Sequence, residues 1–488
     1  MKYSKLIFSI LAAGLILSSC TKDYTKINTD PNRLPKTRPE LLLESAVYSI
    51  VQANQTRALR LTHEMMQVHV TVINSDEIHR YIIRPSESDA MWNSWYLQLT
   101  NFKDMYEQAK FLSQANQAYN NSYMAIARIM EVYVTSLITD TYGNVPFTEA
   151  NKGRSDDLYQ PKFDKQQAIY DSLFKHLEEA NTLLARNDTL PSVLRPRDPL
   201  YAGDISKWRK FGNSLYLRLL LRVSGRPESN AAAKIQQIVQ TSPATYPIFA
   251  NNSESAVLKF STTAPFVSAF NTYRDYDFNG DNGLSQFFIN TLNYWEDPRR
   301  TKWAATVGGN YEGIPSGYAS GQQPERLSYY LAALKNEPLT GNILSYAELQ
   351  FILAEAALRG YTNGTPKTLY ENGVNNAITY WGLAVPAGHL AKPGIAWDDL
   401  ATFEQKLELI MTQKYFTFFF TDFQSWFEHR RTGYPTLPIG PGVQNNKIMP
   451  TRLVYPTLVQ SLNRVNYDAA VAEMGGDNML VKVWWDVN

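Results

Sequence analysis

Seven residues near the middle of the chain have the spacing of a calcium-binding loop. The segment Asp275-Tyr-Asp-Phe-Asn-Gly-Asp281 puts oxygen-bearing side chains at alternate positions and a glycine where such a loop turns sharply. The position of the bidentate glutamate holds Gln286 instead, and no flanking helices are evident. The alternative is an Asx-rich turn whose short polar side chains bond to their own backbone. The candidate structural calcium ligands are Asp275, Asp277, Asn279 and Asp281.

The same region carries aromatic side chains that follow no helical or strand period. Flat apolar rings flanked by Asn, Asp and Arg suit sugars, whose C–H faces stack while their hydroxyls form hydrogen bonds. The alternative for each ring is that it packs against its own loop. The candidate ligand-binding residues are Tyr273, Tyr276, Phe278, Tyr311 and Tyr318, with Tyr81 and Arg84 in an earlier loop.

Motifs for catalysis are mostly missing. His63-Glu64 begins like a zinc-peptidase helix, but Gln67 stands where the second histidine ligand belongs. One cysteine excludes a cysteine-rich zinc site, and there is no nucleophile elbow, P-loop or dinucleotide fingerprint. Paired catalytic carboxylates need no local motif, so a surface glycoside hydrolase remains an alternative. We expect that the chain is not an enzyme and that it requires no cofactor.

The first residues have the order of a lipoprotein signal peptide. Lys2 and Lys5 precede the apolar run Leu6–Leu17, which is too short to span a bilayer. Leu17-Ser-Ser-Cys20 then matches a lipidation site, so residues 1–19 are predicted to be a signal peptide and Cys20 the lipidated residue. Residues 20–38 contain turn-forming residues without apolar periodicity and read as a tether. The alternatives are an ordinary secretory signal or a helix with a buried cysteine.

The elements that position these residues are predicted to be mainly α-helical. Apolar residues recur at helical spacing within 39–225 and 344–475, whereas 226–343 is rich in Gly, Pro, Asn and Ser and reads as ordered loops with short helices. Ser345–Glu348 and Thr402–Gln405 fit capping boxes, which explains Glu348 as a capping residue. The pair 345–360 and 367–381 is reminiscent of a tetratricopeptide hairpin, although the repeat is not strict.

Charge gives no sign of a nucleic-acid partner. The chain has 47 basic and 46 acidic side chains, and loss of the signal peptide with its two lysines makes the mature net charge slightly negative. A balance this close to neutral lacks the basic footprint of nucleic-acid or anionic-lipid binding.

Several segments, in order, resemble the SusD/RagB family of nutrient-binding lipoproteins, particularly its branch with an N-x-D-P-N motif. The similarity covers nearly the whole chain. The segments that carry the resemblance are Asn28–Asn32, Asp140–Ala150, Asp204–Arg222 with Trp208–Leu215 inside it, Asp297–Arg299, Tyr346–Ala356, Trp426–Pro435, Pro450–Pro456 and Trp484–Trp485.

The resemblance implies residues 39–488 are one SusD-like domain, with four tetratricopeptide-like helix pairs supporting a loop-rich ligand face. It implies an outer-membrane lipoprotein, facing the exterior, that captures oligosaccharides and passes them to a SusC-like TonB-dependent transporter barrel. Capture of peptides is the alternative within the family. The family motifs are mostly scaffold and carry no ligand residues over to this chain, so we expect the ligand site within 226–343.

Overall fold

Long helices form where apolar residues recur at helical spacing in the sequence. The computed structural model describes residues 37–73, 77–115 and 117–488, of which Pro39–Asn488 make up one compact unit. The predicted signal peptide, Cys20 and the tether as far as residue 36 lie outside the described residues. Among the described helices, none is both long and apolar enough to cross a membrane.

Seventeen α-helices occur in the described residues, and the predicted mainly α-helical fold is confirmed. They are α3 Pro39–Arg57, α4 His63–Met65, α5 Pro85–Gln114, α6 Asn120–Tyr142, α7 Gly153–Asp156, α8 Gln166–Ala185, α9 Ile205–Arg222, α10 Ala231–Gln236, α11 Asp275–Asn279, α12 Gln286–Tyr294, α13 Arg300–Trp303, α14 Tyr346–Leu358, α15 Pro366–Thr379, α16 Phe403–Thr417, α17 Gln424–Thr432, α18 Thr457–Leu462 and α19 Arg464–Met474.

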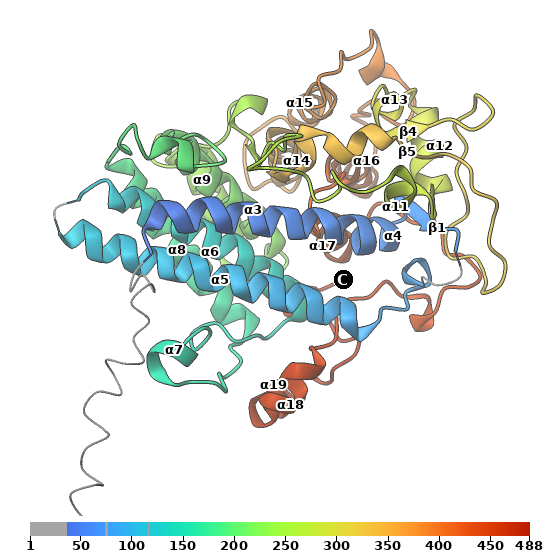
Figure 1. The fold of residues 1–488 in the computed structure, drawn as a ribbon. Coiled ribbons are helices and arrows are strands. Elements are labelled where there is room, and N and C mark those ends of the chain that lie inside the picture. Colours follow the sequence, from blue (N-terminus) through green and yellow to red (C-terminus); the bar gives the residue numbers. More distant parts are fainter. Residues whose placement is uncertain (1–36, 74–76, 116) are drawn as a thin grey trace, which may run out of the picture. The chain divides into compact units, whose positions relative to one another are not determined.

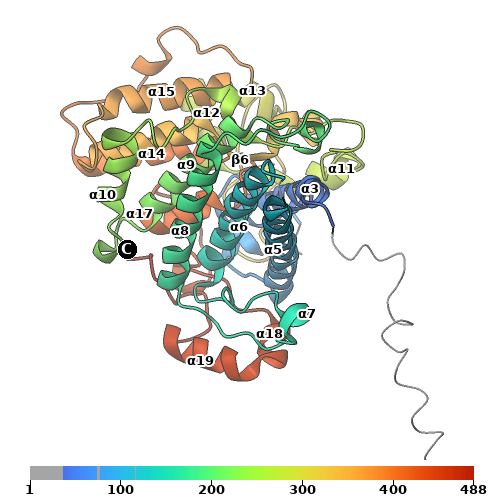
Figure 2. The ribbon, with the colours of Figure 1, turned by 90° about the vertical axis from the view of Figure 1, so that its left-hand side faces the viewer.

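The longest helices pack side by side in chain order. Helix α3 packs on α5, α5 on α6, α6 on α8 and α8 on α9, while α14 packs on both α15 and α16 (Figures 1 and 2). Helix α6 is buried along almost its whole length, as expected of a helix covered by neighbours on every side. Helices α3, α5, α8 and α9 therefore surround α6.

Helix caps match the sequence prediction in one case and differ in the other. Thr402 and Gln405 form a reciprocal capping box at the start of α16. Ser345 also caps α14, but Glu348 does not complete that box. Its carboxylate is buried and receives two hydrogen bonds of 2.6 Å from Arg218, so the prediction that capping explains Glu348 is wrong.

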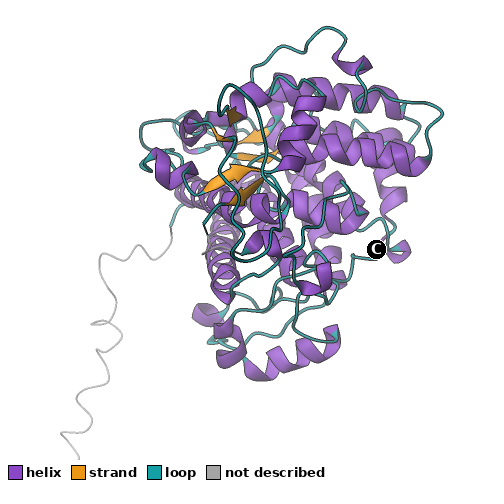
Figure 3. Ribbon diagram, turned by 90° about the vertical axis from the view of Figure 1, so that its right-hand side faces the viewer, coloured by secondary structure: helices purple, strands orange, loops and turns teal. Residues whose placement is uncertain are grey.

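Six short strands pair across the loop-rich region, all antiparallel (Figure 3). Each pairing joins segments far apart in the sequence, most notably residues 69–71 with 282–284. This pairing brings the 275–281 segment against the end of the first helical run. The pairs are β1 His69–Thr71 with β3 Asn282–Leu284, β2 Ala256–Val257 with β6 Asn342–Leu344, and β4 Ala304–Ala305 with β5 Tyr329–Tyr330.

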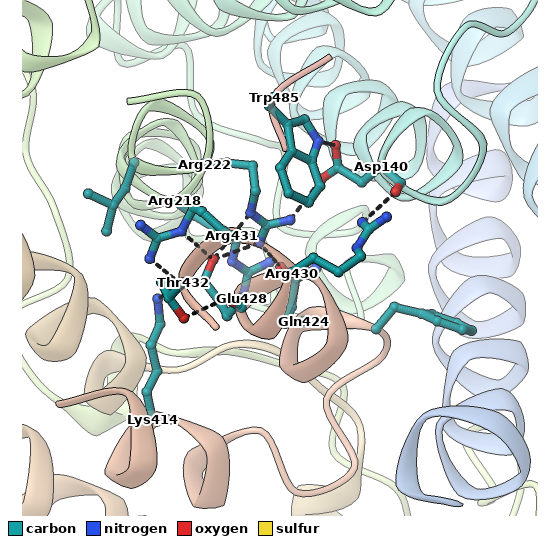
Figure 4. A network of polar contacts seen from close by, with 12 residues as sticks. Asp140, Arg218, Arg222, Lys414, Gln424, Glu428, Arg430, Arg431, Thr432 and Trp485 are labelled. Carbon is teal, nitrogen blue, oxygen red and sulfur yellow. Dashed lines mark hydrogen bonds and ion pairs between the residues drawn. The ribbon is translucent and has the colours of Figure 1, made fainter. Parts of the chain in front are cut away.

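A buried ion network joins α6, α9, α14, α16 and α17. Arg222 reaches Asp140 at 2.9 Å and Glu428 at 3.0 Å, and Figure 4 shows its guanidinium lying between the two carboxylates. Glu428 also pairs with Lys414 and Arg431, at 2.6 and 2.7 Å. The members of the network are Asp140, Arg222, Glu355, Lys414, Glu428 and Arg431.

The cations of this network determine the protonation state of Glu428. Burial alone would raise the pKa of Glu428, but Arg431, Lys414 and Arg222 hold that pKa well below its usual range. The carboxylate is therefore ionised at neutral pH, with its lone pairs occupied by three cations. Such a network is costly to break because any lost partner leaves an uncompensated buried charge.

Candidate functional site

A polar recess lies where the first helical run meets β1 and the segment from α11 to β3. Arg60 and Asp277 at its edge are exposed, so the recess opens to the surface. Its volume is about 30 Å³, close to the space of a single small polar group. The lining residues, referred to below as the recess, are Leu59, Arg60, Glu64, His69, Thr71, Asp277, Phe278, Asp281 and Asn282.

Two buried histidines behind the recess share one tyrosine hydroxyl. Nδ1 of His69 lies 2.8 Å from the Tyr330 hydroxyl, and Nδ1 of His63 lies 3.0 Å from the same oxygen. Burial lowers the pKa of His69 to about 3 and, together with the charge of His69, puts that of His63 well below its usual value. Both rings are therefore neutral at physiological pH.

Asn282 also lines the recess. Its side chain is 5% exposed, and its Nδ2 donates to the Asp281 carboxylate at 3.2 Å. Its Oδ1 has no hydrogen-bond partner within the described part of the chain. Buried carbonyl oxygens are rarely left without a donor, so this atom marks a place where one is missing.

An aromatic platform stands beside the recess. Tyr276 is 67% exposed, and its ring lies over Gly280, where an added Cβ would come within 2.4 Å of it. The Arg326 guanidinium stacks 3.7 Å from the centre of the Tyr329 ring and donates to the backbone carbonyl of Asn282 at 2.9 Å. The platform, defined as Tyr276, Arg326 and Tyr329, is thus tied to the recess wall.

A groove between α3 and α5 extends the same face. Its volume is about 190 Å³, and Arg57 on its α3 side forms an ion pair of 2.7 Å with Glu87. Arg57 lies one turn before Arg60 of the recess, so groove and recess share one helical run. The groove is lined by Ala53, Thr56, Arg57, Ala90, Met91, Ser94 and Trp95.

The predicted ligand-binding residues divide by exposure. Tyr276 is exposed, while Tyr273 and Tyr311 are half-buried, the first against Phe270 and the second beneath the Arg300 guanidinium. Arg84 is exposed at the start of α5. Of this set, Tyr276 is the ring best placed to meet a ligand.

Three of the predicted rings are core residues. Phe278 is 1% exposed and packs on Phe270 and Tyr330, so its ring has no free face for stacking. Tyr318 is 6% exposed and donates its hydroxyl to the Thr71 carbonyl at 2.7 Å. Tyr81 is 5% exposed. These three placements correct the prediction, because tertiary contacts bury rings that no local period marks as core.

The predicted calcium loop has a different conformation. Residues 275–279 form helix α11 instead of an open ligand loop. Asp277 gives both oxygens to Arg274 at 2.7 Å, and Asp275 pairs with Lys335. Within the described residues, no three His, Cys, Asp or Glu side chains gather where a metal ion would fit. The segment therefore does not form the predicted calcium site in this structure.

Sequence reasoning missed His69, Asn282, Arg326 and Tyr329. Each belongs to a strand of two or three residues, or lies next to one, and is brought to the site by pairing with distant chain. No local spacing marks such residues. The unmatched polarity of His69 and Asn282 becomes visible only once β1 and β3 are paired.

A second pocket, of about 210 Å³, lies on another face of α5 and differs in character. Trp92, Tyr96, Leu458 and Leu462 line it together with Tyr159, which is 74% exposed. Its largely apolar wall suits an apolar side chain better than a hydroxyl-rich ligand. We therefore take the recess, platform and groove as the candidate ligand face.

Asp277, a carboxylate of the recess, is held ionised, unlike the general acid of a glycosidase. The hydrogen bond and charge of Arg274 hold the pKa of Asp277 below its usual value, whereas a glycosidase acid needs a raised pKa. The face is arranged for binding.

Residues 31–456 match the model of the SusD-like family described as starch-binding and associating with the outer membrane. No curated protein matches the sequence.

Solved structures share the fold over nearly the whole chain. A chitin-binding protein is 27% identical, with a TM-score of 0.76 over 92% of this chain and 100% of its own. A SusD-like protein of Bacteroidetes AC2a is 24% identical, with a TM-score of 0.78 over 93% and 100%. A chitin-binding SusD homolog from Flavobacterium johnsoniae is 21% identical, with a TM-score of 0.80 over 92% and 99%.

Proposed function

Because the chain belongs to the SusD-like family of outer-membrane-associated binding proteins, which are not enzymes, we propose that it captures oligosaccharide nutrients. The ligand would lie across the platform, the recess and the groove between α3 and α5. We further propose that it delivers the ligand to a TonB-dependent transporter barrel of the SusC type. The lipid anchor at Cys20, facing the cell exterior, is part of the same proposal.

The observation that carries the proposal is an exposed ring beside a polar recess. Tyr276 offers a flat apolar surface, and the recess a short distance along the chain offers amide, imidazole and carboxylate groups. Sugars need this combination, because one face of a pyranose is made of C–H groups while its rim carries hydroxyls. A similar structure with a chitin-binding function supports a carbohydrate as the ligand class.

The proposed delivery depends on a shift between two states of the protein, open and closed over the barrel. A lid that swings on a tether spends time open and closed over its barrel, and a ligand bound better by the closed state favours closure. The ligand must then touch both proteins, or else it shifts nothing.

The binding proposal is tested with the purified full-length chain in detergent on a glycan array and, in parallel, with a peptide mixture. We expect retention of glycans, and loss of that retention in Tyr276→Ala. Leu400→Ser is the matched control, because Leu400 is 95% exposed and lies outside the candidate face. If the chain retains peptides and no glycans, its ligand class is peptides. If Tyr276→Ala binds glycans as well as the wild-type chain does, the ligand site does not include Tyr276.

The transporter proposal needs a separate experiment. We expect the chain to co-purify from outer membranes with a TonB-dependent barrel, whether or not glycan is present. Absence of any barrel after mild crosslinking would contradict delivery while leaving capture intact.

A further inference from the structure

A further pocket, of about 260 Å³, lies where the start of α8, the end of α19 and the C-terminal segment meet. Its size is close to the lower limit of about 300 Å³ for small-ligand pockets. In Figure 2 the C-terminal end of the chain and α11, which carries Tyr276, lie on opposite sides of the molecule. This C-terminal pocket is therefore separate from the candidate ligand face. Six of its lining residues matter below: Asn144, Lys165, Gln167, Glu473, Lys482 and Trp484.

An aromatic side chain in a fixed position lines the C-terminal pocket. Trp484 is half-buried, so part of its surface is open to the pocket. Its Nε1 donates to Glu228 at 3.2 Å, and its backbone oxygen accepts a hydrogen bond from Arg226. The neighbouring Trp485 is 1% exposed and is committed to the core through Asp140. Of the two adjacent tryptophans, Trp484 is thus the one that presents a flat apolar surface to a ligand.

The polar side chains of the C-terminal pocket include both hydrogen-bond donors and acceptors. Glu473 accepts from Lys165 at 2.5 Å and from Asn144 at 2.9 Å, which leaves further lone pairs on its carboxylate. Gln167 and Lys482 are exposed, and neither side chain forms a hydrogen bond or ion pair within the described residues. The pocket therefore offers an amide, an ammonium group and a carboxylate to a ligand.

The charges of these groups favour a neutral ligand. An anion drawn to Lys482 would also meet the carboxylate of Glu473 in the same pocket, and a cation would meet the ammonium group. A hydroxyl both donates and accepts through one oxygen, so hydroxyls match such a mixture of partners. The C–H face of a pyranose matches the ring of Trp484. A neutral sugar unit combines the two.

We propose that the C-terminal pocket is a second carbohydrate-binding site, which takes a neutral sugar unit stacked on Trp484. The inference goes beyond the proposed function and takes from it only the ligand class. Gln167 and Lys482 bind the hydroxyls of the stacked unit. Two sites on opposite sides of one chain hold it to a polysaccharide while either site is empty, because rebinding is then an intramolecular event.

The first test locates the bound sugar without a variant. The full-length chain in detergent is illuminated with chitohexaose or maltohexaose carrying a diazirine, and the labelled peptides are identified by mass spectrometry. We expect two labelled regions, one around Tyr276 and one that includes Lys482 and Trp484. An excess of unlabelled hexasaccharide should remove both labels. Labelling around Tyr276 alone would overturn the second site.

The second test measures binding of the same hexasaccharides by calorimetry. We expect two binding events, of which Trp484→Leu weakens only the second, about three- to tenfold, because leucine keeps apolar packing and removes the flat ring. The double variant Gln167→Ala, Lys482→Ala should weaken the same event. Lys110→Ala is the matched control, because Lys110 is an exposed residue of α5 that lines none of the pockets described. Thermal unfolding shows whether each variant folds, and the double variant decides if Trp484→Leu does not.

The outcomes separate the second site from the proposed function. If the chain shows one binding event, which Tyr276→Ala weakens and the variants of the C-terminal pocket leave unchanged, the second site is wrong and glycan capture stands. If the wild-type chain binds no glycan of any kind, the proposed function fails as well. If hexagalacturonate labels the C-terminal pocket and neither neutral hexasaccharide does, the assignment of a neutral sugar is wrong.

Discussion

Single residues on the ligand face divide into those that contact ligand and those that hold the face together. Tyr276 and Phe278 are two positions apart, yet one ring is 67% exposed and the other 1%. The short helix α11 turns the first outward and the second into the core. Tyr276 is thus placed to contact ligand and Phe278 to pack in the core, and substitutions at the two positions should have different effects.

Tyr276→Ala should weaken retention of a bound oligosaccharide about three- to tenfold with little change in stability, because it removes an exposed stacking surface. Phe278→Ala should instead cost about 3–5 kcal/mol of unfolding free energy, since it empties a buried site. Calorimetric titration and urea unfolding of both variants check the division. A large loss of stability in Tyr276→Ala would contradict it.

At the scale of elements, the family-like motifs meet in the buried ion network and its surroundings. Asp140 ends α6, Arg222 ends α9, Glu355 lies on α14, and Glu428 and Arg431 lie on α17. Each side chain satisfies a charge from another helix, so the network fixes how the helices cross. The motifs therefore specify the scaffold, while the loops that they support carry the ligand face.

Glu428→Ala should lower the free energy of unfolding by about 3–5 kcal/mol, because Arg222, Lys414 and Arg431 then lose a shared counter-charge in the core. Asp468→Ala is the control. It removes an ion pair with Arg464 whose side chains are 70% and 51% exposed, and such pairs contribute at most about 1 kcal/mol. Equal losses in the two variants, measured by urea unfolding, would refute a structural role for the network.

The helical scaffold is largely predictable from the sequence, whereas the ligand recess is not. Helices repeat their apolar residues every three to four positions, so α5, α6, α9 and α14 are visible locally. His69 and Asn282 line one recess only because β1 pairs with β3, some 210 residues further along. Burial of Tyr318 and Phe278 also depends on distant partners. Periodicity identifies regular elements alone, so it does not show which rings in aperiodic loops are buried.

At the scale of the whole molecule, all six histidines are held neutral by burial. Burial lowers the pKa of His69 to about 3 and the pKa values of His79 and His429 to about 4, and it lowers those of His63, His176 and His389 as well. The unfolded chain takes up protons at these sites below about pH 6.5, whereas the folded chain does not. Acid therefore favours the unfolded state.

Stability should consequently be constant above about pH 7 and fall as the pH drops through 6 toward 4. Each fully suppressed histidine contributes a slope of about 1.4 kcal/mol per pH unit in that range. Urea unfolding between pH 4.5 and 8 measures the slope, and His79→Gln should reduce it. A flat profile down to pH 5 would show that the histidines titrate alike in both states.

The predicted tether is also tested on the whole molecule. Cys20→Ala should leave oligosaccharide affinity unchanged and reduce uptake by cells, because a released lid loses the high effective concentration that attachment to the same membrane provides. If cells still take up oligosaccharide although the Cys20→Ala protein is found in the medium, membrane attachment is not required for uptake.

The position of Trp485 bears on the order in which the chain folds. Its indole Nε1 donates at 2.7 Å to the buried carboxylate of Asp140, across 345 residues of sequence. Burial raises the pKa of Asp140 against the pull of Arg222, so this carboxylate depends on its donors to stay in the core. Contacts of such separation form late, because the intervening chain must first be ordered. The hydrogen bonds that hold the Asp140 carboxylate in the core are therefore complete only when residue 485 is in place.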